Sequence, residues 1–326
     1  MIIRSSLKEK NSGNLKTPDS IASLLPGLTE LVCALGLESR LSGRSHECDF
    51  PESVTSLPVL TSPRYNVSPD QDNAEIHQSV TELLKQALSI YEVDDEKLLK
   101  IKPDAVLTQD HCEVCAVSLS DLSDSLRREL GKNCNIISPS PIDLNSMLES
   151  FQIVAGHLGV PERGEELIQS IQSRFSKLRE RTGSLPKPDV VAIEWIDPLM
   201  TGGNWIPELI EIAGGTNRLA TAGKHSPFIE WNKICAVNPD FLLILPCGYP
   251  ISRTLSEMQT LESRPGWQKL SAVRTGNVYI LDGNHYFNRP GPRVADSAEI
   301  LAHIFHPEFF NSVDTYRDSG WIRYSS

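Results

Sequence analysis

Histidine and cysteine side chains occur at a metal-like spacing in residues 111–115, which read His-Cys-Glu-Val-Cys. Two thiols separated by two residues, with an adjoining imidazole, are ligands that Zn²⁺ accepts. A closed tetrahedral centre needs two further ligands, and the loop 46–48 is their obvious source. The alternative is thiols that pack in the core or form a redox-labile pair. We therefore predict that the protein has no metal site. If a metal were bound, the cluster that would hold it comprises Cys48, His111, Cys112 and Cys115.

Two histidines lie near carboxylates and so raise the question of acid–base catalysis. His285 follows Asp282 by three residues, and His225 precedes Glu230 by five. No nucleophile motif accompanies either pair, and a single histidine beside a carboxylate in a turn is usually structural. Neither Gly-x-Gly-x-x-Gly nor a Walker-type phosphate loop is present in the sequence. These observations predict a protein that is not an enzyme and has no catalytic cofactor, with a small-molecule hydrolase as a minor alternative.

A dense set of polar and aromatic side chains fills residues 284–293, which read Asn-His-Tyr-Phe-Asn-Arg-Pro-Gly-Pro-Arg. The β-branched and aromatic segment 278–281 before it is typical of a buried strand that ends in an Asp-Gly turn. Apolar residues at helical spacing follow it from Val294 to Phe305. Ligands of open α/β sheets bind at the carboxyl ends of strands, where each strand is followed by a helix. The sequence therefore predicts that this segment forms the rim of a binding cleft.

Composition narrows the class of ligand and the compartment. The 326 residues are 40% hydrophobic and carry a net charge of −11, which disfavours nucleic acid and anionic membranes as partners. Residues 1–18 lack the apolar core of a secretory signal, and no segment is long enough to span a bilayer. The odd number of cysteines, seven, fits a reducing compartment. The expectation is a monomeric cytosolic protein that binds a small molecule and does not insert into membranes.

The order of predicted elements divides the chain into two α/β units. Strands and helices alternate up to residue 140, two consecutive helices follow at 142–158 and 162–182, and alternation then resumes at Asp189. A helix of about twenty residues spans roughly 30 Å and can act as a rigid strut. The predicted organisation is a disordered tail (1–17), a first lobe (18–140), a helical bridge (141–186), a second lobe (187–308) and a C-terminal extension (309–326).

The two predicted lobes also repeat each other in sequence. Residues 29–40 align without a gap with residues 207–218, and residues 101–107 are similar to residues 237–243. The two pairs occur in the same order in both halves of the chain. Ordered internal echoes indicate two related units. Two similar α/β lobes bridged by a long rigid helix, with the ligand between them, is the simplest architecture that accommodates both echoes.

Four motifs in this order resemble a known family. They are Ser-Leu-Leu-Pro-Gly-Leu-Thr-Glu at 23–30, Ser-His-Glu-Cys-Asp-Phe-Pro at 45–51, Lys-Pro-Asp at 102–104 and Phe-Asn-Arg-Pro-Gly-Pro-Arg at 287–293. Together they resemble the cobalamin-binding substrate-binding proteins of ABC importers over about residues 20–307. The resemblance implies the helical-backbone periplasmic-binding-protein fold, with a corrinoid such as cobalamin held reversibly in the cleft.

The same resemblance implies which residues line the cleft, and aromatic faces with hydrogen-bonding rims would suit a flat macrocycle. Five loops would contribute them, two from the second lobe and three from the first. The implied ligand-binding residues are Pro26, Gly27, His46, Glu47, Phe50, Arg64, Tyr65, Trp195, Asp197, Asn204, Trp205, Tyr286, Phe287 and Arg289. The remaining tryptophans Trp267 and Trp321 are expected in the core.

Several alternatives stay open beside this reading. A histidine, either His46, His111 or His285, could serve as an axial ligand to corrinoid cobalt. The ligand could instead be another tetrapyrrole, a metal or a siderophore, because fold does not fix ligand. The family's two acidic docking residues match Glu96 in the first lobe and, imperfectly, Asn232 in the second, where Glu230 lies nearby. A transporter or an acceptor protein contacting Glu96 and Glu230 is therefore the expected partner. The remaining functional class is a protein-interaction scaffold whose lobes bind no ligand.

Overall fold

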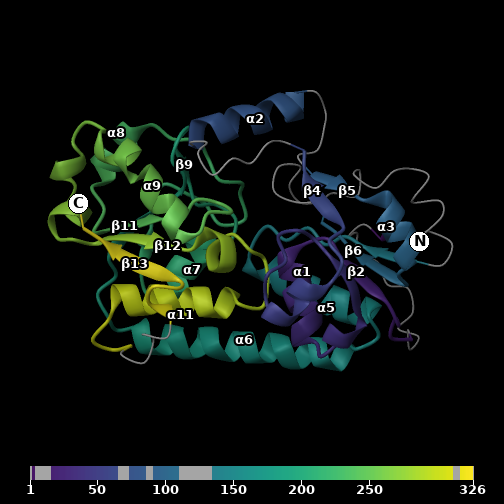
Figure 1. Cartoon of the computed structure of the whole chain (residues 1–326). Helices are drawn as coiled ribbons and strands as arrows, with labels where there is room; N and C mark the ends of the chain where they lie inside the picture. The colour runs from purple at the N-terminus through teal and green to yellow at the C-terminus, as the bar shows by residue number, and fades with distance from the viewer. Residues whose placement is uncertain are drawn as a thin grey trace.

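The computed structural model describes residues 2–3, 16–64, 73–85, 91–109, 134–310 and 316–325. Two α/β lobes stand side by side above one long helix, with the first lobe on the right in Figure 1 and the second on the left. The predicted fold class, two similar α/β lobes bridged by a long helix, is confirmed. Within the described ranges, no helix is both long and apolar enough to cross a membrane.

The first lobe is built on a five-stranded parallel sheet. Its strand order is β1 (Ile2–Ile3), β7 (Asn135–Ile137), β6 (Ala105–Leu107), β2 (Ile21–Ser23) and β3 (Leu41–Arg44). Strand β1 lies within the segment expected as a disordered tail, where its two β-branched residues pair with Ile136 and Ile137. The other elements of this lobe are α1 (Pro26–Ala34), η1 (Glu38–Arg40), η2 (Glu52–Ser56), the antiparallel pair β4 (Thr61–Pro63) and β5 (Tyr91–Val93), α2 (Asn73–Lys85) and α3 (Asp95–Ile101).

The second lobe holds a six-stranded mixed sheet. Its path runs β10 (Thr216–Asn217), β8 (Asp189–Trp195), β11 (Phe241–Ile244), β12 (Val278–Leu281) and β13 (Trp321–Tyr324), and β9 (Met200–Thr201) pairs with β8. The helices are α7 (Ile206–Ile212), α8 (Trp231–Val237), α9 (Ile251–Glu262), η4 (Trp267–Lys269), α10 (Ser271–Arg274), the π-helical turn η5 (Gly283–Phe287) and α11 (Val294–Phe305). Strand β13, antiparallel to β12, incorporates part of the C-terminal extension into this sheet.

Alternating side chains bury both faces of each sheet, as expected for parallel strands covered by helices. In β8, Val190 and Ala192 pack in one cluster with residues of α7 and α11, while Val191 and Ile193 pack in another with residues of α8 and α9. Trp267 and Trp321 are 1% and 6% exposed. The prediction that these two tryptophans belong to the core is therefore confirmed.

Helix α6 (Pro161–Thr182) connects the lobes and runs beneath both of them (Figure 1). Near its start, the Arg163 guanidinium donates to the carbonyl of Leu35 in the first lobe at 2.9 Å. Further along, Arg174 forms ion pairs with Asp296 and Glu299 of α11. Helix α5 (Leu144–His157), which starts with an Asp143 capping box, packs along the same helix. One continuous helix is thus anchored in both lobes.

The two similar sequence segments, 101–107 and 237–243, form the same kind of turn in the two lobes. Lys102 and Asn238 end helices α3 and α8 in the left-handed conformation, with φ of 51° and 46°. Two residues later, the Asp104 carboxylate accepts from the Ser20 backbone N–H at 3.0 Å, and the Asp240 carboxylate accepts from that of Asp189 at 2.9 Å. Each Pro-Asp turn therefore ties a helix end to a strand of its own lobe's sheet, β2 in the first lobe and β8 in the second.

Helix α2 differs from its sequence prediction in length and in role. Helical spacing predicts a helix over 73–91, but α2 ends at Lys85, and Tyr91 begins strand β5 because its backbone pairs with β4. Figure 1 shows α2 across the top of the molecule, reaching from the first lobe toward the second. Val80 packs on the first lobe's core, while the His77 ring lies edge-on to Phe228 at 6.1 Å. Helix α2 therefore contacts both lobes.

Candidate functional site

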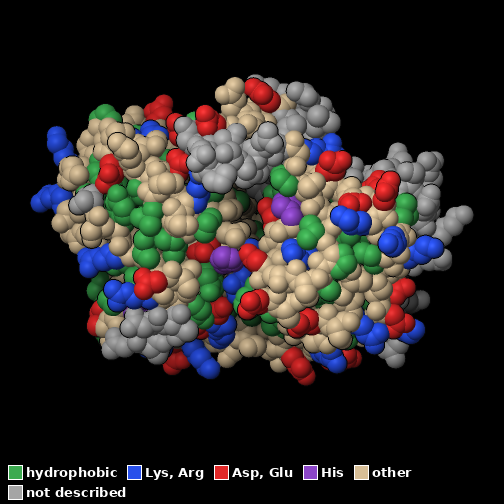
Figure 2. Space-filling model, viewed as in Figure 1, with side chains coloured by type: hydrophobic (Ala, Val, Ile, Leu, Met, Phe, Trp, Pro, Cys, Tyr) green, Lys and Arg blue, Asp and Glu red, His purple; other side chains and the backbone are tan. Residues whose placement is uncertain are grey.

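Loops from the carboxyl ends of strands in both lobes meet at one junction. The start of α1 and the loop 46–50 after β3 come from the first lobe, and residues 282–293 after β12 come from the second. Figure 2 shows histidine and charged side chains gathered along this junction. A Cβ added at Gly27 would lie 2.3 Å from the Pro290 carbonyl oxygen, so the two lobes touch backbone to backbone here. This contact requires glycine because any side chain would collide with the opposite loop.

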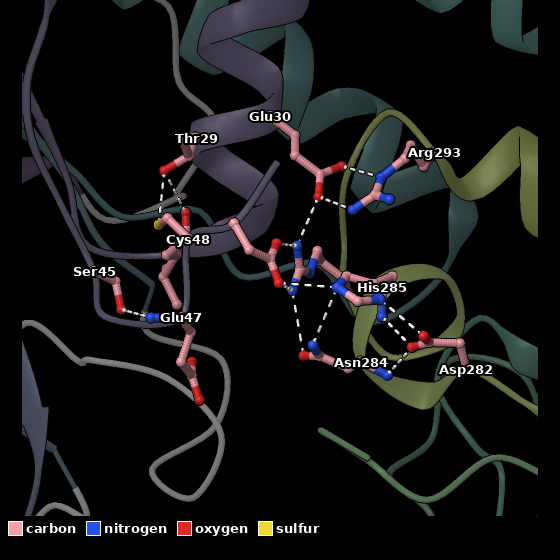
Figure 3. A network of polar contacts seen from close by, with 12 residues as sticks. Thr29, Glu30, Ser45, Glu47, Cys48, Asp282, Asn284, His285 and Arg293 are labelled. Atoms are coloured by element: carbon pink, nitrogen blue, oxygen red, sulfur yellow. Dashed lines mark hydrogen bonds and ion pairs between the residues drawn. The ribbon is translucent and has the colours of Figure 1, made fainter. Parts of the chain in front are cut away.

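An ion-pair network joins the lobes beside this contact (Figure 3). The Glu30 carboxylate on α1 accepts from Arg289 at 3.0 Å and from both Nε and Nη2 of Arg293 at 2.9 and 2.5 Å. The side chains of Glu30 and Arg289 are only 2% and 4% exposed. Buried charges are tolerated where they are paired and hydrogen-bonded, as they are here. The network therefore holds the two lobes in a defined relative position.

The Asp49 carboxylate extends this network toward the protein surface by linking Arg289 to His285. Its carboxylate lies 2.6 Å from Arg289 Nη1 and 2.9 Å from His285 Nε2, while His285 Nδ1 lies 2.8 Å from the Asp282 carboxylate. The hydrogen bonds that His285 donates to the Asp282 and Asp49 carboxylates raise the pKa of its imidazole to about 9, which favours the charged ring at neutral pH. Burial alone would raise the pKa of Asp49, but the bonds from His285 and Arg289 outweigh burial and hold that pKa well below its ordinary value.

Loop 46–50 also presents groups that do not join this network. The Phe50 ring is 45% exposed and carries the Arg293 guanidinium over its face at 4.1 Å. Glu47 accepts from the Tyr91 hydroxyl at 2.9 Å, and burial raises the pKa of its carboxyl. His46 Nδ1 lies 2.7 Å from Thr61 Oγ1, and burial lowers the pKa of this imidazole. The first lobe's side of the junction thus carries one partly exposed aromatic ring and several polar groups that are already hydrogen-bonded within the lobe.

The structure places the predicted second-lobe residues in two different environments. Trp195 is half-buried at the end of β8, with its ring edge-on to Tyr249 at 5.4 Å and its indole N–H donating to the Asp197 carbonyl. Asn204, with φ of 50°, is also half-buried. Trp205 and Phe287 are 5% and 0% exposed instead.

Trp205 and Phe287, which were predicted to line the cleft, are buried in the core of the second lobe. The Trp205 indole N–H donates to the Phe287 carbonyl at 2.8 Å, and both rings pack in the lobe core. A buried indole needs a hydrogen-bond partner, and the loop carbonyl supplies it. Tyr286 is half-buried between the Arg293 guanidinium and the Tyr316 ring.

The remaining predicted first-lobe residues are partly described. Pro26 is the half-buried first residue of α1, and exposed Arg64 donates to the Tyr91 carbonyl. Tyr65 lies outside the described residues, as do His111, Cys112 and Cys115. Cys48 is buried against the Thr29 hydroxyl at 3.0 Å, and burial raises the pKa of its thiol to about 11. In the described part of the chain, no group of three or more metal-ligating side chains could hold an ion.

Three residues of the junction were not anticipated from sequence as contacts between lobes. Glu30, Asp49 and Arg293 belong to motifs that the sequence analysis quoted, but their pairing joins positions more than 200 residues apart. The available signal was charge: two carboxylates in first-lobe motifs, one of them on α1, and two arginines in one Pro-rich segment. Phe228 was also missed, and at 62% exposure it is the most exposed large hydrophobic side chain among the described residues.

The fold and this junction define a two-lobe solute-binding protein with a helical bridge. The family profile described as periplasmic binding protein matches residues 21–285. The chain therefore belongs to the periplasmic binding protein family.

Relatives with known names agree with this assignment. A vitamin B12-binding protein of Vibrio cholerae is 22% identical over 288 residues, covering 86% of this chain and 87% of that protein. An uncharacterized ABC transporter substrate-binding lipoprotein of Bacillus subtilis is 22% identical over 304 residues, covering 90% and 82%. The expectation of a cytosolic protein is wrong, because the family is described as periplasmic and this relative as a lipoprotein.

Solved structures of low sequence identity share the fold. The periplasmic vitamin B12-binding protein of Vibrio cholerae superposes with a TM-score of 0.60 at 19% identity, over 89% of this chain and 98% of that one. A periplasmic heme-binding protein from Pseudomonas aeruginosa superposes with a TM-score of 0.64 at 20% identity, over 90% and 94%. At such identities the likeness shows the fold and leaves the ligand open.

Proposed function

We propose that this protein binds a corrinoid reversibly between its two lobes and presents it to an ABC importer, without chemical turnover. The observation that carries the proposal is the convergence of strand-end loops from both lobes on one junction, where ligands of open α/β sheets bind. Named relatives that bind vitamin B12 supply the class of ligand.

The charges at the junction favour a corrinoid over heme as the ligand. Arg289, Arg293 and His285 each already face a carboxylate of Glu30, Asp49 or Asp282. A dianionic heme would have to compete with these carboxylates for its cations, and breaking a buried pair is costly. A corrinoid with neutral amide side chains needs hydrogen-bonding rims and an aromatic face instead, which Glu47 and Phe50 provide.

A second candidate ligand, heme or a related tetrapyrrole, is supported by the heme-binding proteins of the same fold. Titration of the purified protein with cyanocobalamin, cobinamide, hemin and a ferric siderophore, followed by absorbance and calorimetry, separates these classes. We expect saturable corrinoid binding and ligand recovered chemically unchanged. Binding of hemin alone would refute the corrinoid, and altered ligand would refute a purely binding function.

The partner would contact the exposed side chains of Glu96 on α3 and Glu230 before α8. Exposed acidic residues meeting basic ones across an interface give a salt-sensitive contact that steers association. The double variant Glu96→Lys/Glu230→Lys should keep its corrinoid affinity and lose ligand transfer to transporter-containing vesicles. The control reverses Glu149 and Glu165, which are exposed on α5 and α6. Equal transfer by both double variants would refute this contact.

A further inference from the structure

Glu194 carries a buried carboxyl group that takes no part in the ion-pair network between the lobes. It is the last residue but one of β8. Strands β8, β11 and β12 run parallel, so Glu194 lies at the edge of the sheet from which the junction segment 282–293 departs. The residue is half-buried, but its Oε2 atom is buried and has no hydrogen-bond partner among the described residues. A buried oxygen in this state requires an explanation.

The other oxygen of this carboxyl group is fully accounted for. The Ser226 hydroxyl donates to Glu194 Oε1 at 2.8 Å and accepts from the Gly203 backbone N–H at 3.0 Å. Ser226 is 3% exposed, and a Cβ added at Gly203 would lie 2.6 Å from the Ser226 backbone nitrogen. The two loops therefore touch and hold the carboxyl group in one orientation, with Oε2 left for a partner that the described part of the lobe does not supply.

Asn204 adds a second oxygen without a partner to the same cluster. It follows Gly203 directly, and its φ of 50° is in the left-handed region. Its backbone N–H donates to the Lys224 carbonyl at 2.7 Å, and its carbonyl accepts from the Gly223 N–H at 3.0 Å, so the neighbouring loop fixes this conformation. The side-chain Oδ1 is buried and forms no hydrogen bond with any residue in the described ranges. Two buried acceptor oxygens thus lack a donor at one end of the second lobe's sheet.

The charge state of Glu194 restricts what could bind there. Burial raises the pKa of its carboxyl to about 7, above the ordinary 4.5, although the Ser226 hydrogen bond and the nearby His225 oppose the shift. Both protonation states are therefore populated near neutral pH. A primary amide suits either state, because its NH2 group donates to a carboxylate or to Asn204 Oδ1 and its oxygen accepts from a protonated carboxyl. A carboxylate has no hydrogen to donate, and ionised Glu194 would repel it.

We propose that Glu194 and Asn204 form a subsite for a primary amide of the bound ligand, and so select amide-bearing macrocycles over their carboxylate forms. The inference rests on the proposed function and deepens it, since corrinoids carry primary amides around the ring and heme carries carboxylates. Binding an amide gives both buried oxygens a partner, which they lack in the free protein. An analogue without the donor leaves them unpaired, and sites of this kind discriminate strongly against such analogues.

The experiment compares dicyanocobinamide with dicyanocobyrinic acid, in which carboxylates replace the amides. Cyanide fills the axial positions of both, so the comparison is restricted to the ring substituents. In calorimetric titrations, the wild type should bind dicyanocobinamide at least about 100-fold more tightly. Glu194→Gln keeps the size of the side chain and gains a donor for carboxylates, so it should reduce this preference by about 10-fold or more. Asn204→Gly permits the left-handed backbone and deletes the side-chain amide, so it should weaken dicyanocobinamide binding by about 3–10-fold.

Controls separate the subsite from net charge, from folding and from the broader function. Glu211→Gln removes the same charge from an exposed position on α7 and should retain the wild-type preference. Circular dichroism checks that the variants are folded. An equal preference in Glu194→Gln and Glu211→Gln, or equal affinity of the wild type for both corrinoids, would refute the amide subsite while corrinoid binding stands. Unchanged dicyanocobinamide binding by Asn204→Gly would remove Asn204 from the subsite. If neither corrinoid binds the wild type, the proposed function and this inference both fall.

Discussion

The Arg289 guanidinium of the second lobe lies 2.6 Å from the Asp49 carboxylate of the first, across a sequence separation of 240 residues. The same guanidinium pairs with Glu30, and its side chain is 4% exposed. This buried cation lies between two carboxylates of the opposite lobe. A few side chains therefore fix the relative position of the two lobes.

Arg289→Met tests this dependence. Removing the cation leaves the Glu30 and Asp49 carboxylates with fewer partners in a buried setting, so we expect the unfolding free energy to fall by about 3–5 kcal/mol. Urea denaturation measures the change. The control Arg40→Met removes a surface partner of Asp19 and should leave the unfolding free energy nearly unchanged. Similar stability in both variants would contradict a structural role for the Arg289 network.

The raised pKa of His285 predicts a pH-dependent stability. Its pKa is about 9 in the folded protein against an ordinary 6.5, because Asp282 and Asp49 favour the protonated ring. The stabilisation is therefore complete below pH 6.5 and is lost as the pH rises through about 9. The side chain is 34% exposed. After allowing for solvent screening, we expect a loss of about 1–2 kcal/mol.

Urea denaturation at pH 6 and pH 9.5 checks this expectation by comparing the wild type with His285→Gln. The variant has no titrating imidazole, so the difference in unfolding free energy between the two proteins should shrink with rising pH. A difference that stays constant across this range would show that the ring is not charged in the folded protein.

Gly27→Ala should disturb the junction because the added Cβ would sit 2.3 Å from the Pro290 carbonyl oxygen. Backbone on both sides leaves no flexible atom to move, so we expect a cost of about 1–3 kcal/mol and displaced lobes. Gly156→Ala in α5 is the matched control, since its Cβ would meet nothing within 4 Å. That change should stabilise the helix by about 0.5–1 kcal/mol. Small-angle scattering and denaturation measure both effects.

Trp195, at the end of β8, and Trp205, just before α7, should respond differently to alanine. Trp195 is half-buried at the strand end, so Trp195→Ala should weaken ligand binding by about 1 kcal/mol or more while keeping the fold. Trp205 is buried in the lobe core, so Trp205→Ala should lower the unfolding free energy by about 3–5 kcal/mol. Calorimetric titration and thermal denaturation measure the pair. Normal binding by a folded Trp195→Ala protein would remove Trp195 from the site.

Helix α2 is expected to slow ligand exchange because it contacts both lobes. Its contact with the second lobe includes the edge-to-face pair of His77 and Phe228, which is worth about 0.5–1.5 kcal/mol. Phe228→Ala should therefore increase the ligand dissociation rate by about 2–10-fold, measured by displacement in a stopped-flow instrument. Phe309→Ala, an exposed ring after α11, should leave the rate unchanged. An unchanged rate in Phe228→Ala would show that α2 does not cover the site.

The sequence by itself determined the architecture because the signals for it are local. Helical spacing with Pro161 at the first turn identified α6, and the repeated Pro-Asp turns at 102–104 and 238–240 marked equivalent places in two related lobes. Motif order further indicated the family that the comparisons show. Strand ends and loop chemistry also located the regions that meet at the junction.

Only the tertiary structure decided what the side chains on those loops do. Trp205 and Phe287 stand at loop positions that favour a cleft, yet chain folding turns both rings into the core. The pairing of Asp49 with Arg289 and the contact between the His46 ring and the Thr61 hydroxyl depend on neighbours that are not adjacent in sequence. Burial and pairing arise from packing between segments far apart in the chain, and local periodicity carries no information about them.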